Sequence, residues 1–375
     1  MERIGIFGGS FDPVHNEHVA AVRAAAESLQ LNRVFVVPSH IAPHKTGGAN
    51  ASGADRLTMC RLAFEALPYV AVDDSELTGG GTSYTYLTCR AFRERFPDAA
   101  LFFLVGADML EDFFTWRNPD DILKNVTLAA FSRGEEGVCA LHEKFVSRFR
   151  KDFCEVPFCG KDISSTAVRV KIAFGKQTDE LSERVRAYID EKGLYTHPAI
   201  APALALEKEE RVEHSYRVAL LAARLAPKYK VAQSKAILAS ALHDCAKYVP
   251  LSSPLLMGFA TPDDVPSPVL HQYTGAYLAE HEFHITDEEV LDAIRYHTSG
   301  RENMSPLGKL IFLADMLEEG RSFEGVERLR ELFYEDIDAC LKEALFRQVA
   351  YLKATGKPVY PLTQRAYDWI LNHEI

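Results

Sequence analysis

The opening of the chain constrains the fold most, because a short apolar segment ends there in two glycines and a helical pattern follows. Residues 3–7 are rich in β-branched and aromatic side chains, Gly8 and Gly9 come next, and an alanine-rich helical pattern covers residues 15–29. Similar segments alternate along the chain, with strand patterns at 34–37, 70–72, 101–105 and 126–131 and helical patterns at 55–66, 84–96 and 165–175. This alternation predicts a parallel α/β sheet.

The pattern changes near residue 200. Beyond this point apolar residues recur with helical spacing and no clear strand segment, and a proline-rich loop covers residues 249–268. At 375 residues the chain is long for one domain, and each half is large enough to bury a core of its own. We therefore predict two domains, at residues 1–198 and 203–375.

Composition argues against several classes of protein. The formal net charge is −11 and no sustained run of Lys and Arg occurs, which argues against general binding to nucleic acid. No apolar run approaches the ~20 residues that span a bilayer, and the first residues lack a secretory signal, so we expect no membrane segment. The seven cysteines are scattered without a Cys-x-x-Cys pair. This usage suits a reducing compartment, and we expect a cytoplasmic protein.

Residues 8–18, Gly-Gly-Ser-Phe-Asp-Pro-Val-His-Asn-Glu-His, have the chemistry of a phosphate-binding segment. Gly8 and Gly9, at the end of the first strand, let phosphates approach the backbone, and the next helix offers free N–H groups and the positive end of its dipole. His15 and His18 lie three residues apart, so that both imidazoles can face one phosphate chain. The segment therefore suits stabilisation of charge during nucleotidyl transfer.

This segment resembles the H-x-G-H signature of the adenylyl- and cytidylyltransferase superfamily. Over about the first 195 residues the chain is similar to bacterial nicotinate mononucleotide adenylyltransferase, because further segments agree in order, at residues 38–45, 83–85, 106–109, 116, 132–133 and 163–169. The resemblance implies a Rossmann-like nucleotidyltransferase fold. It also implies attack of the mononucleotide phosphate on the α-phosphorus of ATP, with pyrophosphate leaving, Mg²⁺ bridging phosphate oxygens, and no covalent enzyme intermediate.

The same resemblance implies roles for individual residues. Those implied in catalysis are His15, His18, Lys45 and Arg169. Those implied in ATP binding are Gly8, Gly9, Ser10, Phe11, His15, His18, Gly106, Asp108, Ser164, Ser165, Thr166 and Arg169. Those implied in binding nicotinate mononucleotide are Lys45, Thr85, Trp116 and Arg133, with the indole stacking on the pyridine ring. These residue types fit the reaction, because phosphoryl transfer depends mainly on positioning and on neutralisation of charge.

One position departs from the family pattern. The family usually has glycine immediately before the second histidine, whereas this chain has Glu17. A side chain and a negative charge are thereby added to a segment that binds phosphates. Our hypothesis is that the Glu17 carboxylate points away from the nucleotide.

The second half of the chain contains histidines and aspartates that suit a metal centre. They are spread over predicted helices, at His214, His243, Asp244, His271, His297 and Asp315. Neutral imidazoles and carboxylates together suit iron, manganese or zinc, and one aspartate can bridge two metals ~3.5–4 Å apart. The order His, His-Asp, Asp resembles the HD phosphohydrolase superfamily, which implies an all-α domain.

Residues 211–214, 243–247, 271, 296–300 and 315–321 together are similar to the bacterial HD hydrolase that splits diadenosine tetraphosphate symmetrically into two ADP. The resemblance implies a first metal on His214, His243, Asp244 and Asp315, and a second on His271 and His297 with Asp244 as the bridge. The metals would be iron, with manganese as the alternative, and would activate a water against a central phosphorus. Phosphate oxygens would be held by Lys247, Thr298 and Arg321, and Asp244 and Lys247 would serve in catalysis. Glu318 would bond a ligand histidine or pair with Arg321.

The leading hypothesis is a bifunctional enzyme of NAD biosynthesis that makes nicotinate adenine dinucleotide and also destroys a dinucleoside polyphosphate. Phosphopantetheine or nicotinamide mononucleotide remain as alternative acceptors at the first site. A guanosine alarmone or a simple nucleotide remains as an alternative substrate at the second. A hypothesis of another class makes the HD half a non-catalytic nucleotide sensor. The oligomeric state stays open, with a homo-oligomer among the alternatives.

Overall fold

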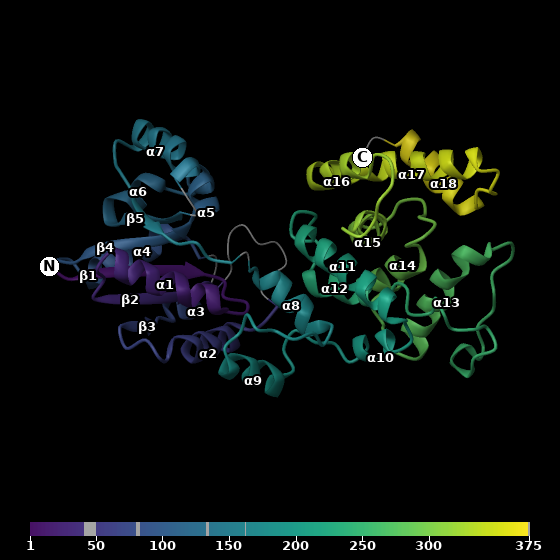
Figure 1. Cartoon of the computed structure of the whole chain (residues 1–375), viewed down its shortest axis with the longest axis horizontal. Helices are drawn as coiled ribbons and strands as arrows, with labels where there is room; N and C mark the ends of the chain where they lie inside the picture. Colours follow the sequence, from purple (N-terminus) through teal and green to yellow (C-terminus); the bar gives the residue numbers. More distant parts are fainter. Residues whose placement is uncertain (41–49, 80–82, 133–134, 162, 374–375) are drawn as a thin grey trace. The chain divides into compact units, whose positions relative to one another are not determined.

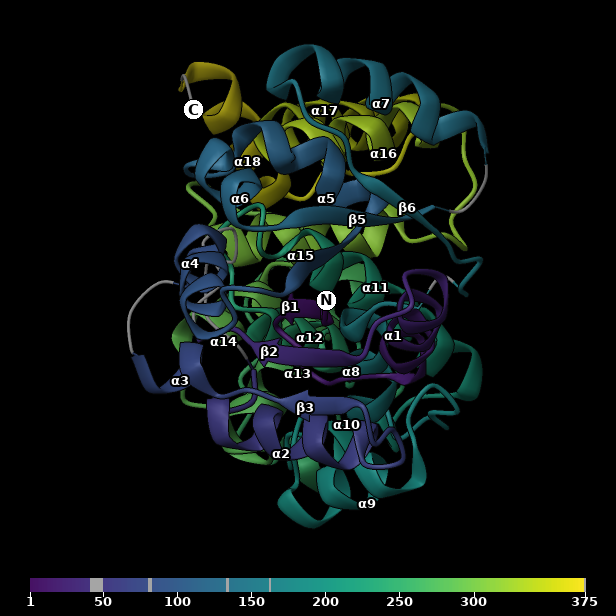
Figure 2. The same cartoon turned by 90° about the vertical axis from the view of Figure 1, so that its left-hand side faces the viewer.

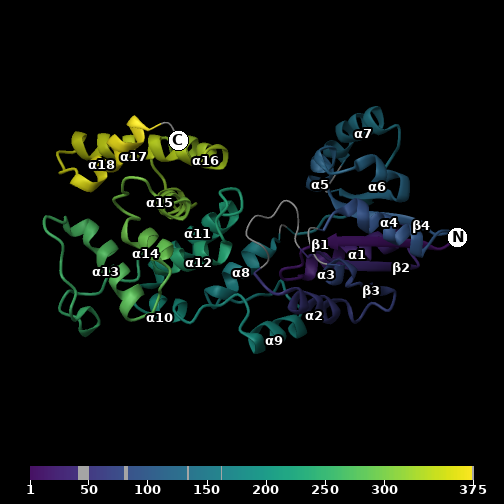
Figure 3. The same cartoon turned by 180° about the vertical axis from the view of Figure 1, so that it is seen from behind.

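The computed structural model describes residues 1–40, 50–79, 83–132, 135–161 and 163–373. The chain forms two compact units, which Figures 1 and 3 show from opposite sides. The first unit contains Met1–Val168 and Thr178–Leu194, and the second contains Arg169–Gln177 and Tyr195–Ile375. In the described part of the chain, no helix is both long and apolar enough to cross a membrane.

The first unit is built on a six-stranded sheet with the order β3-β2-β1-β4-β5-β6, in which every neighbouring pair is parallel. Figure 2 faces this unit, and the labels β3, β2, β1, β5 and β6 follow one another across it. The strands are β1 (Arg3–Gly9), β2 (Arg33–Pro38), β3 (Val70–Val72), β4 (Ala100–Gly106), β5 (Thr127–Ser132) and β6 (Cys154–Pro157). This arrangement confirms the predicted parallel α/β fold.

Helices lie between the strands of the first unit and follow its last strand, β6. They are α1 (Asn16–Ser28), α2 (Gly53–Phe64), α3 (Ser75–Gly79), α4 (Thr85–Arg95), α5 (Ala107–Asp112), η1 (Phe113–Thr115), α6 (Pro119–Asn125), α7 (Glu135–Phe149), α8 (Ser165–Ala173) and α9 (Glu183–Lys192). The central strand β4 is buried from Leu101 to Val105, as expected for a strand that helices cover on both faces. The sequence patterns did not predict β6, because this short edge strand has one buried residue, Val156, and ends in proline.

The second unit is entirely helical in its described residues. Its helices are α10 (Ile200–Leu204), α11 (Glu209–Leu225), α12 (Gln233–Leu242), η2 (Pro254–Leu256), α13 (Ser267–His281), α14 (Glu288–Arg295), α15 (Pro306–Leu317), α16 (Val326–Glu335), α17 (Ile337–Ala354) and α18 (Pro361–Asn372). Helix α15 contacts α11, α12, α14, α16 and α17, and is buried almost all round. A helix that is apolar on every face belongs in the centre of a core. The expected all-α domain is confirmed.

The division between the units falls inside α8 rather than only near residue 200. Val170, Ala173 and Phe174, in the second half of α8 and just after it, belong to the hydrophobic core of the helical unit. The chain then returns to the first unit with residues 178–194, where α9 contacts α2. The change in composition along the sequence indicated a single boundary near residue 200. The structure instead assigns residues 169–177 to the second unit as well, because apolar side chains of α8 pack in its core.

Candidate active sites

The first site lies where the order of the strands reverses. β1 pairs with β2 on one side and with β4 on the other, so consecutive crossovers leave β1 in opposite directions. In open α/β sheets, ligands bind at the carboxyl ends of the strands at such a point. The segment of residues 8–18 begins there, because Gly8 and Gly9 end β1 and α1 starts at Asn16.

The loop after β1 has a compact, constrained backbone. Phe11 has a positive φ of 48°, a conformation that side-chain-bearing residues seldom adopt. Its ring lies so close to Gly9 that a Cβ added there would be 3.0 Å from the ring. A side chain at position 9 would therefore force the Phe11 ring to move, and backbone strain of the kind seen at Phe11 is typical of ligand-binding segments.

His15 and His18 lie together at the start of α1. Their rings stack with centroids 3.7 Å apart, and His18 Nδ1 accepts a hydrogen bond of 3.1 Å from the His15 N–H. Burial lowers the pKa of His15 to about 4, against a smaller opposing effect of Glu180. His15 is therefore neutral at physiological pH, and its ring can act as a hydrogen-bonding group.

The carboxylate of Glu17 is engaged by the loop that precedes α8. Its Oε2 accepts a hydrogen bond of 3.0 Å from the Lys161 N–H and lies against Gly160. The carboxylate is thus partnered by main chain of the β6–α8 loop.

The Ser164, Ser165 and Thr166 segment begins α8. Ser164 Oγ accepts from the Ala167 N–H at 3.1 Å, which is a typical N-cap, and Ser164 is exposed. Ser165 Oγ donates to the Pro13 carbonyl at 2.9 Å. This bond brings the start of α8 together with the loop after β1.

The two residues predicted to recognise the pyridine ring differ in environment. Thr85 is the first residue of α4 and is partly exposed. Trp116 is 9 % exposed and packs against Phe103 and Phe113, and its indole Nε1 is buried without a hydrogen-bond partner among the described residues. Trp116 is therefore part of the core of this unit, with one polar group left unpartnered.

Several other predicted residues have simpler outcomes. Lys45 and Arg133 lie outside the described residues, and so does the side chain of Asp108 in α5. Gly106 ends β4, at the same edge of the sheet as Gly9. Arg169 is buried in the second unit, where its guanidinium donates to the Gln233 side chain of α12, a partner that the sequence did not indicate.

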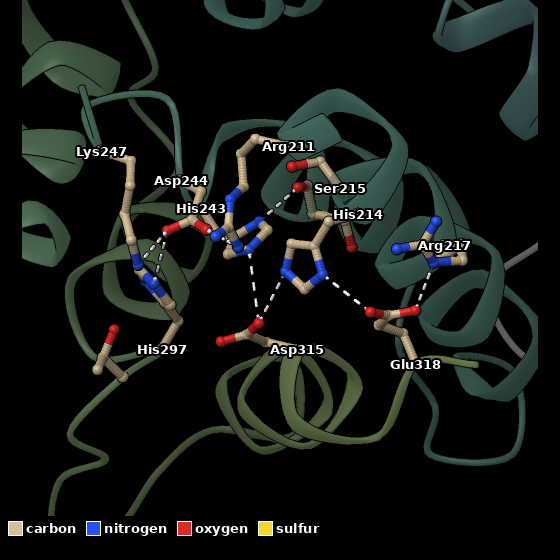
Figure 4. Close-up of polar contacts among 12 residues, drawn as sticks. Arg211, His214, Ser215, Arg217, His243, Asp244, Lys247, His297, Asp315 and Glu318 are labelled. Carbon is tan, nitrogen blue, oxygen red and sulfur yellow. Dashed lines mark hydrogen bonds and ion pairs between the residues drawn. The ribbon is translucent and has the colours of Figure 1, made fainter. Parts of the chain in front are cut away.

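The second site gathers side chains from five helices of the helical unit. His214 is on α11, His243 and Asp244 directly follow α12, His271 is on α13, His297 follows α14 and Asp315 is on α15. Figure 4 shows most of them pointing toward one another above α15. Two groups, His214–His243–Asp315 and His243–Asp244–His297, have ligand atoms within 4.8 Å of one another. The structure thus brings together residues that lie up to a hundred positions apart in the sequence.

Asp244 is the carboxylate shared between the two sides of this cluster. Its Oδ2 lies 3.6 Å from His243 Nε2, and its Oδ1 lies 3.0 Å from His271 Nε2 and 3.5 Å from His297 Nε2. Burial alone would raise the pKa of this carboxyl, but the neighbouring His243 and the hydrogen bonds from His271 and His297 hold it well below its ordinary value. Asp244 is therefore ionised and placed to serve two cations at once.

Three of the histidines are fixed by their other ring nitrogen. The Nδ1 atoms of His243 and His297 lie 2.7 and 2.8 Å from the carbonyls of Ser240 and Ile294, and His214 Nδ1 lies 3.0 Å from Glu318 Oε1. A proton on Nδ1 satisfies each of these acceptors and leaves the Nε2 lone pair aimed into the cluster. Histidine ligands of metals are typically held in this way.

The donor set fits divalent metal ions. His243 is fully buried, burial lowers its pKa to about 4, and its Nε2 has no hydrogen-bond donor among the described residues. This neutral lone pair faces the carboxylates of Asp244 and Asp315, at 3.6 and 4.0 Å. Electron-pair donors that converge without a proton between them are stabilised by a cation, and imidazole with carboxylate suits first-row transition metals.

Three residues predicted to hold phosphate lie at the edge of this cluster. Lys247 Nζ is 3.4 Å from Asp244 Oδ1 and 3.1 Å from His271 Nε2, and Thr298 Oγ1 is 3.2 Å from the same histidine nitrogen. Arg321 donates to Asp315 Oδ1 at 2.6 Å. All three are more exposed than the metal-ligand candidates they contact.

Comparisons with known proteins match both halves of the chain. The Cytidylyltransferase-like family matches residues 6–171 and the HD domain family matches residues 211–320. A Mycoplasma pneumoniae protein named "Probable nicotinate-nucleotide adenylyltransferase/Ap4A hydrolase" is 32 % identical over 322 residues, which cover 85 % of this chain and 89 % of that protein. The chain belongs to this adenylyltransferase/hydrolase family.

Other relatives of the family cover one half of the chain each. A Bordetella avium protein named "Probable nicotinate-nucleotide adenylyltransferase" is 36 % identical over 198 residues, which cover 52 % of this chain and 98 % of that protein. A solved structure named as a predicted HD superfamily hydrolase involved in NAD metabolism, from Clostridium acetobutylicum, is 33 % identical, covers 47 % of this chain and 96 % of that one, and has a TM-score of 0.44.

For this member of the family, the structure adds two arginines to the HD cluster that had no predicted role. Arg217 Nε donates to Glu318 Oε2 at 2.6 Å, so Glu318 joins Arg217 to the ligand candidate His214. The other carboxylate oxygen of Glu318, Oε1, lies 3.7 Å from Arg321 Nε. Arg211 Nη1 lies 3.0 Å from Asp244 Oδ2. Both arginines are three positions from His214 on α11, and side chains at that spacing share a helix face. The three-residue spacing from His214 could therefore have indicated in the sequence that both arginines lie beside this cluster.

Proposed function

We propose that this chain is a bifunctional enzyme of NAD biosynthesis. Its first unit would convert ATP and nicotinate mononucleotide to nicotinate adenine dinucleotide and pyrophosphate, and its second would hydrolyse diadenosine tetraphosphate symmetrically to two ADP. Membership of the adenylyltransferase/hydrolase family over most of the chain supports both activities. The observation that carries the hydrolase is the convergence of the buried Nε2 of His243 with two carboxylates.

At the first site, ATP phosphates would lie against the Gly8–Phe11 loop and the starts of α1 and α8. Main-chain N–H groups there, together with His18, Ser164 and Thr166, would bind phosphate oxygens, and Lys45 and Arg169 would supply positive charge. Neutral His15 would hold the His18 ring in place by stacking. Mg²⁺ would bridge phosphate oxygens. Thr85, Trp116 and Arg133 would orient nicotinate mononucleotide so that its phosphate lies in line with the α-phosphorus of ATP.

At the second site, His214, His243, Asp244 and Asp315 would hold one divalent metal, and His271 and His297 would complete a second around Asp244. Iron is the proposed ion and manganese the alternative, and the metals would supply an activated water and polarise the phosphates. Lys247, Thr298 and Arg321 would hold the oxygens of a tetraphosphate so that a central phosphorus is presented to the cluster. Glu318 would keep the proton of His214 on Nδ1.

One purified preparation tests both activities. ATP would be supplied with nicotinate mononucleotide or nicotinamide mononucleotide, and diadenosine tetraphosphate would be supplied with Fe²⁺, Mn²⁺ or Mg²⁺. We expect nicotinate adenine dinucleotide from the first acceptor and two ADP from the tetraphosphate. Equal turnover of the two acceptors would contradict the nicotinate specificity. Formation of AMP and ATP from the tetraphosphate would contradict symmetrical cleavage.

The comparisons do not favour a non-catalytic HD module, since the relatives that match both halves are named as hydrolases. Functional domains at residues 1–198 and 203–375, a cytoplasmic location and a homo-oligomer stay predictions. So does the absence of nucleic acid among the partners.

A further inference from the structure

The first unit contains a buried arginine that the mechanism above does not use. Arg56, on α2, exposes 2 % of its surface, and no carboxylate forms an ion pair with it among the described residues. Its Nε is buried without a hydrogen-bond acceptor. A buried charge that lacks a counter-ion is costly to the folded protein unless another group balances it.

The hydrogen bonds of Arg56 go to two loops at the ligand-binding edge of the sheet. Nη1 donates to the Ser10 carbonyl at 2.7 Å, and Nη2 donates to the His40 carbonyl at 3.5 Å. Ser10 follows β1 and His40 follows β2, and these strands pair with Gly9 opposite Pro38. One guanidinium therefore connects the loops after two adjacent parallel strands.

The acidic residues nearest in sequence to these contacts are already partnered elsewhere. Asp12, in the loop after β1, accepts from the Asn50 and Ala51 N–H groups at 2.8 and 3.1 Å. Asp55, next to Arg56, accepts from the Tyr188 hydroxyl at 2.9 Å. In the described part of the chain, neither carboxylate forms an ion pair with Arg56, so its guanidinium charge is held mainly by main-chain carbonyls of these two loops.

The bond to Ser10 also fixes the direction of a main-chain donor. The Ser10–Phe11 peptide is trans, so the Phe11 N–H points opposite to the Ser10 carbonyl. Because Arg56 holds that carbonyl, the Phe11 N–H is directed away from the buried guanidinium. Consecutive main-chain N–H groups held in this way form anion-binding loops.

We propose that Arg56 is a positioning residue for the polyphosphate chain of ATP. It fixes the two loops through the Ser10 and His40 carbonyls, and its charge, shielded from water, attracts the phosphates across the loop. This inference rests on the proposed transferase function. It assigns to Arg56 an effect on phosphate binding without direct contact with the nucleotide.

The test compares ATP with adenosine, which lacks the phosphates, by calorimetric titration of the full chain. We expect Arg56→Met to weaken ATP binding by roughly 10- to 100-fold, because the phosphates lose the attraction of a shielded charge and the loops lose their anchor, and to leave adenosine binding within about twofold. Arg56→Lys keeps the charge but has one nitrogen for two carbonyls, so we expect a smaller loss of about 3- to 10-fold for ATP. The second unit is identical in all variants, so a difference reports on the first.

Arg61→Met is the matched control. Arg61 lies on the same helix, its side chain is 58 % exposed, and it is 3.8 Å from Asp74 at the surface. We expect this variant to bind ATP and adenosine as the unmodified chain does.

Two outcomes would overturn the proposal. One is an Arg56→Met chain that binds ATP normally, and the other is an equal loss of ATP and adenosine, which indicates a purely structural role. If Arg56→Met fails to fold, the ATP affinity of Arg56→Lys is the deciding measurement. An unchanged ATP affinity in Arg56→Lys would contradict positioning of the loops through their carbonyls. Separately, an unmodified chain that binds ATP but forms no nicotinate adenine dinucleotide would contradict the proposed function and not this inference.

Discussion

The two sites of this chain are built from different parts of the protein. The proposed first site combines side chains such as His18 with main-chain and hydroxyl groups, in loops at one edge of a sheet and at the starts of α1 and α8. The second consists of imidazoles and carboxylates from five helices, most of them buried. In the first site the backbone supplies many donors, whereas in the second a few side chains supply nearly all of the chemistry.

This difference predicts how strongly a single substitution should affect the activity of each site. A site made of many main-chain donors spreads its binding energy, so that one substitution removes one part of it. A cluster in which one carboxylate serves two groups of ligands concentrates the effect in a single residue. The predictions below test this contrast, from the largest expected effect to the smallest.

The largest effect is expected at Asp244. Replacing it with alanine removes the carboxylate that both groups of ligands share, so we expect loss of tetraphosphate hydrolysis by about 1000-fold or more. Transferase activity should stay unchanged, because the residue lies in the second unit. Asp263→Ala, in an exposed loop of the same unit, is the control and should keep both activities. Retention of hydrolysis in Asp244→Ala would contradict the proposed metal centre.

At the first site we expect a smaller loss from one side chain. His18→Ala removes a donor to the phosphates, which should lower the kcat of the transferase by roughly 100-fold, the lower end of the range for groups that stabilise charge in the transition state. His142→Ala, whose ring pairs with Asp152 at the surface of the same unit, serves as the control. A fall in kcat as large as the loss in Asp244→Ala would break the contrast between the two sites.

Loss of a residue that holds a metal ligand in place should have an effect of intermediate size on metal affinity. Glu318→Gln weakens the bond that fixes His214 and leaves Arg217 without its carboxylate, so we expect metal affinity to fall by about 10- to 100-fold. Metal content after dialysis measures this directly, and added metal should restore hydrolysis. The neighbouring Glu319 is exposed, so Glu319→Gln should have no effect. Unchanged metal content in Glu318→Gln would contradict this role.

Acid should destabilise the first unit through His15. Burial lowers its pKa from 6.5 to about 4, so the unfolded chain binds more protons than the folded one between these values. Stability is therefore lost as pH falls below 6.5, by about 2 kcal/mol between pH 7.5 and pH 5. Denaturant unfolding of the unmodified chain and of His15→Gln at both pH values measures the difference. An equal loss in His15→Gln would show that other groups are responsible.

The smallest effect is expected at the residue that departs from the family pattern. The Glu17 carboxylate accepts from the Lys161 N–H, so Glu17→Ala should change the kcat/KM of the transferase by less than about threefold. A tenfold gain would show instead that the carboxylate opposes phosphate binding. In that case the departure from glycine would be a real cost to the first site.

Much of this organisation was readable from local patterns. The strand patterns at residues 34–37, 70–72, 101–105 and 126–131 correspond to β2, β3, β4 and β5, because alternation and β-branched content are properties of short segments. The six predicted ligands could be named for the same reason, since their motifs are local. Trp116 shows the limit, because one tryptophan in a sequence gives no sign of its packing against Phe103 and Phe113.

The sequence by itself determined the two fold classes, the family resemblance and the candidate residues of both sites. Only the tertiary structure decided that α8 is divided between two cores, that Glu318 joins Arg217 to His214, and that Arg56 lies buried against the loop after β1. The physical reason is distance along the chain. Local patterns record how a segment buries its own apolar face, whereas a charge buried against a distant carbonyl, or a lone pair aimed between two carboxylates, exists only after those segments have packed together.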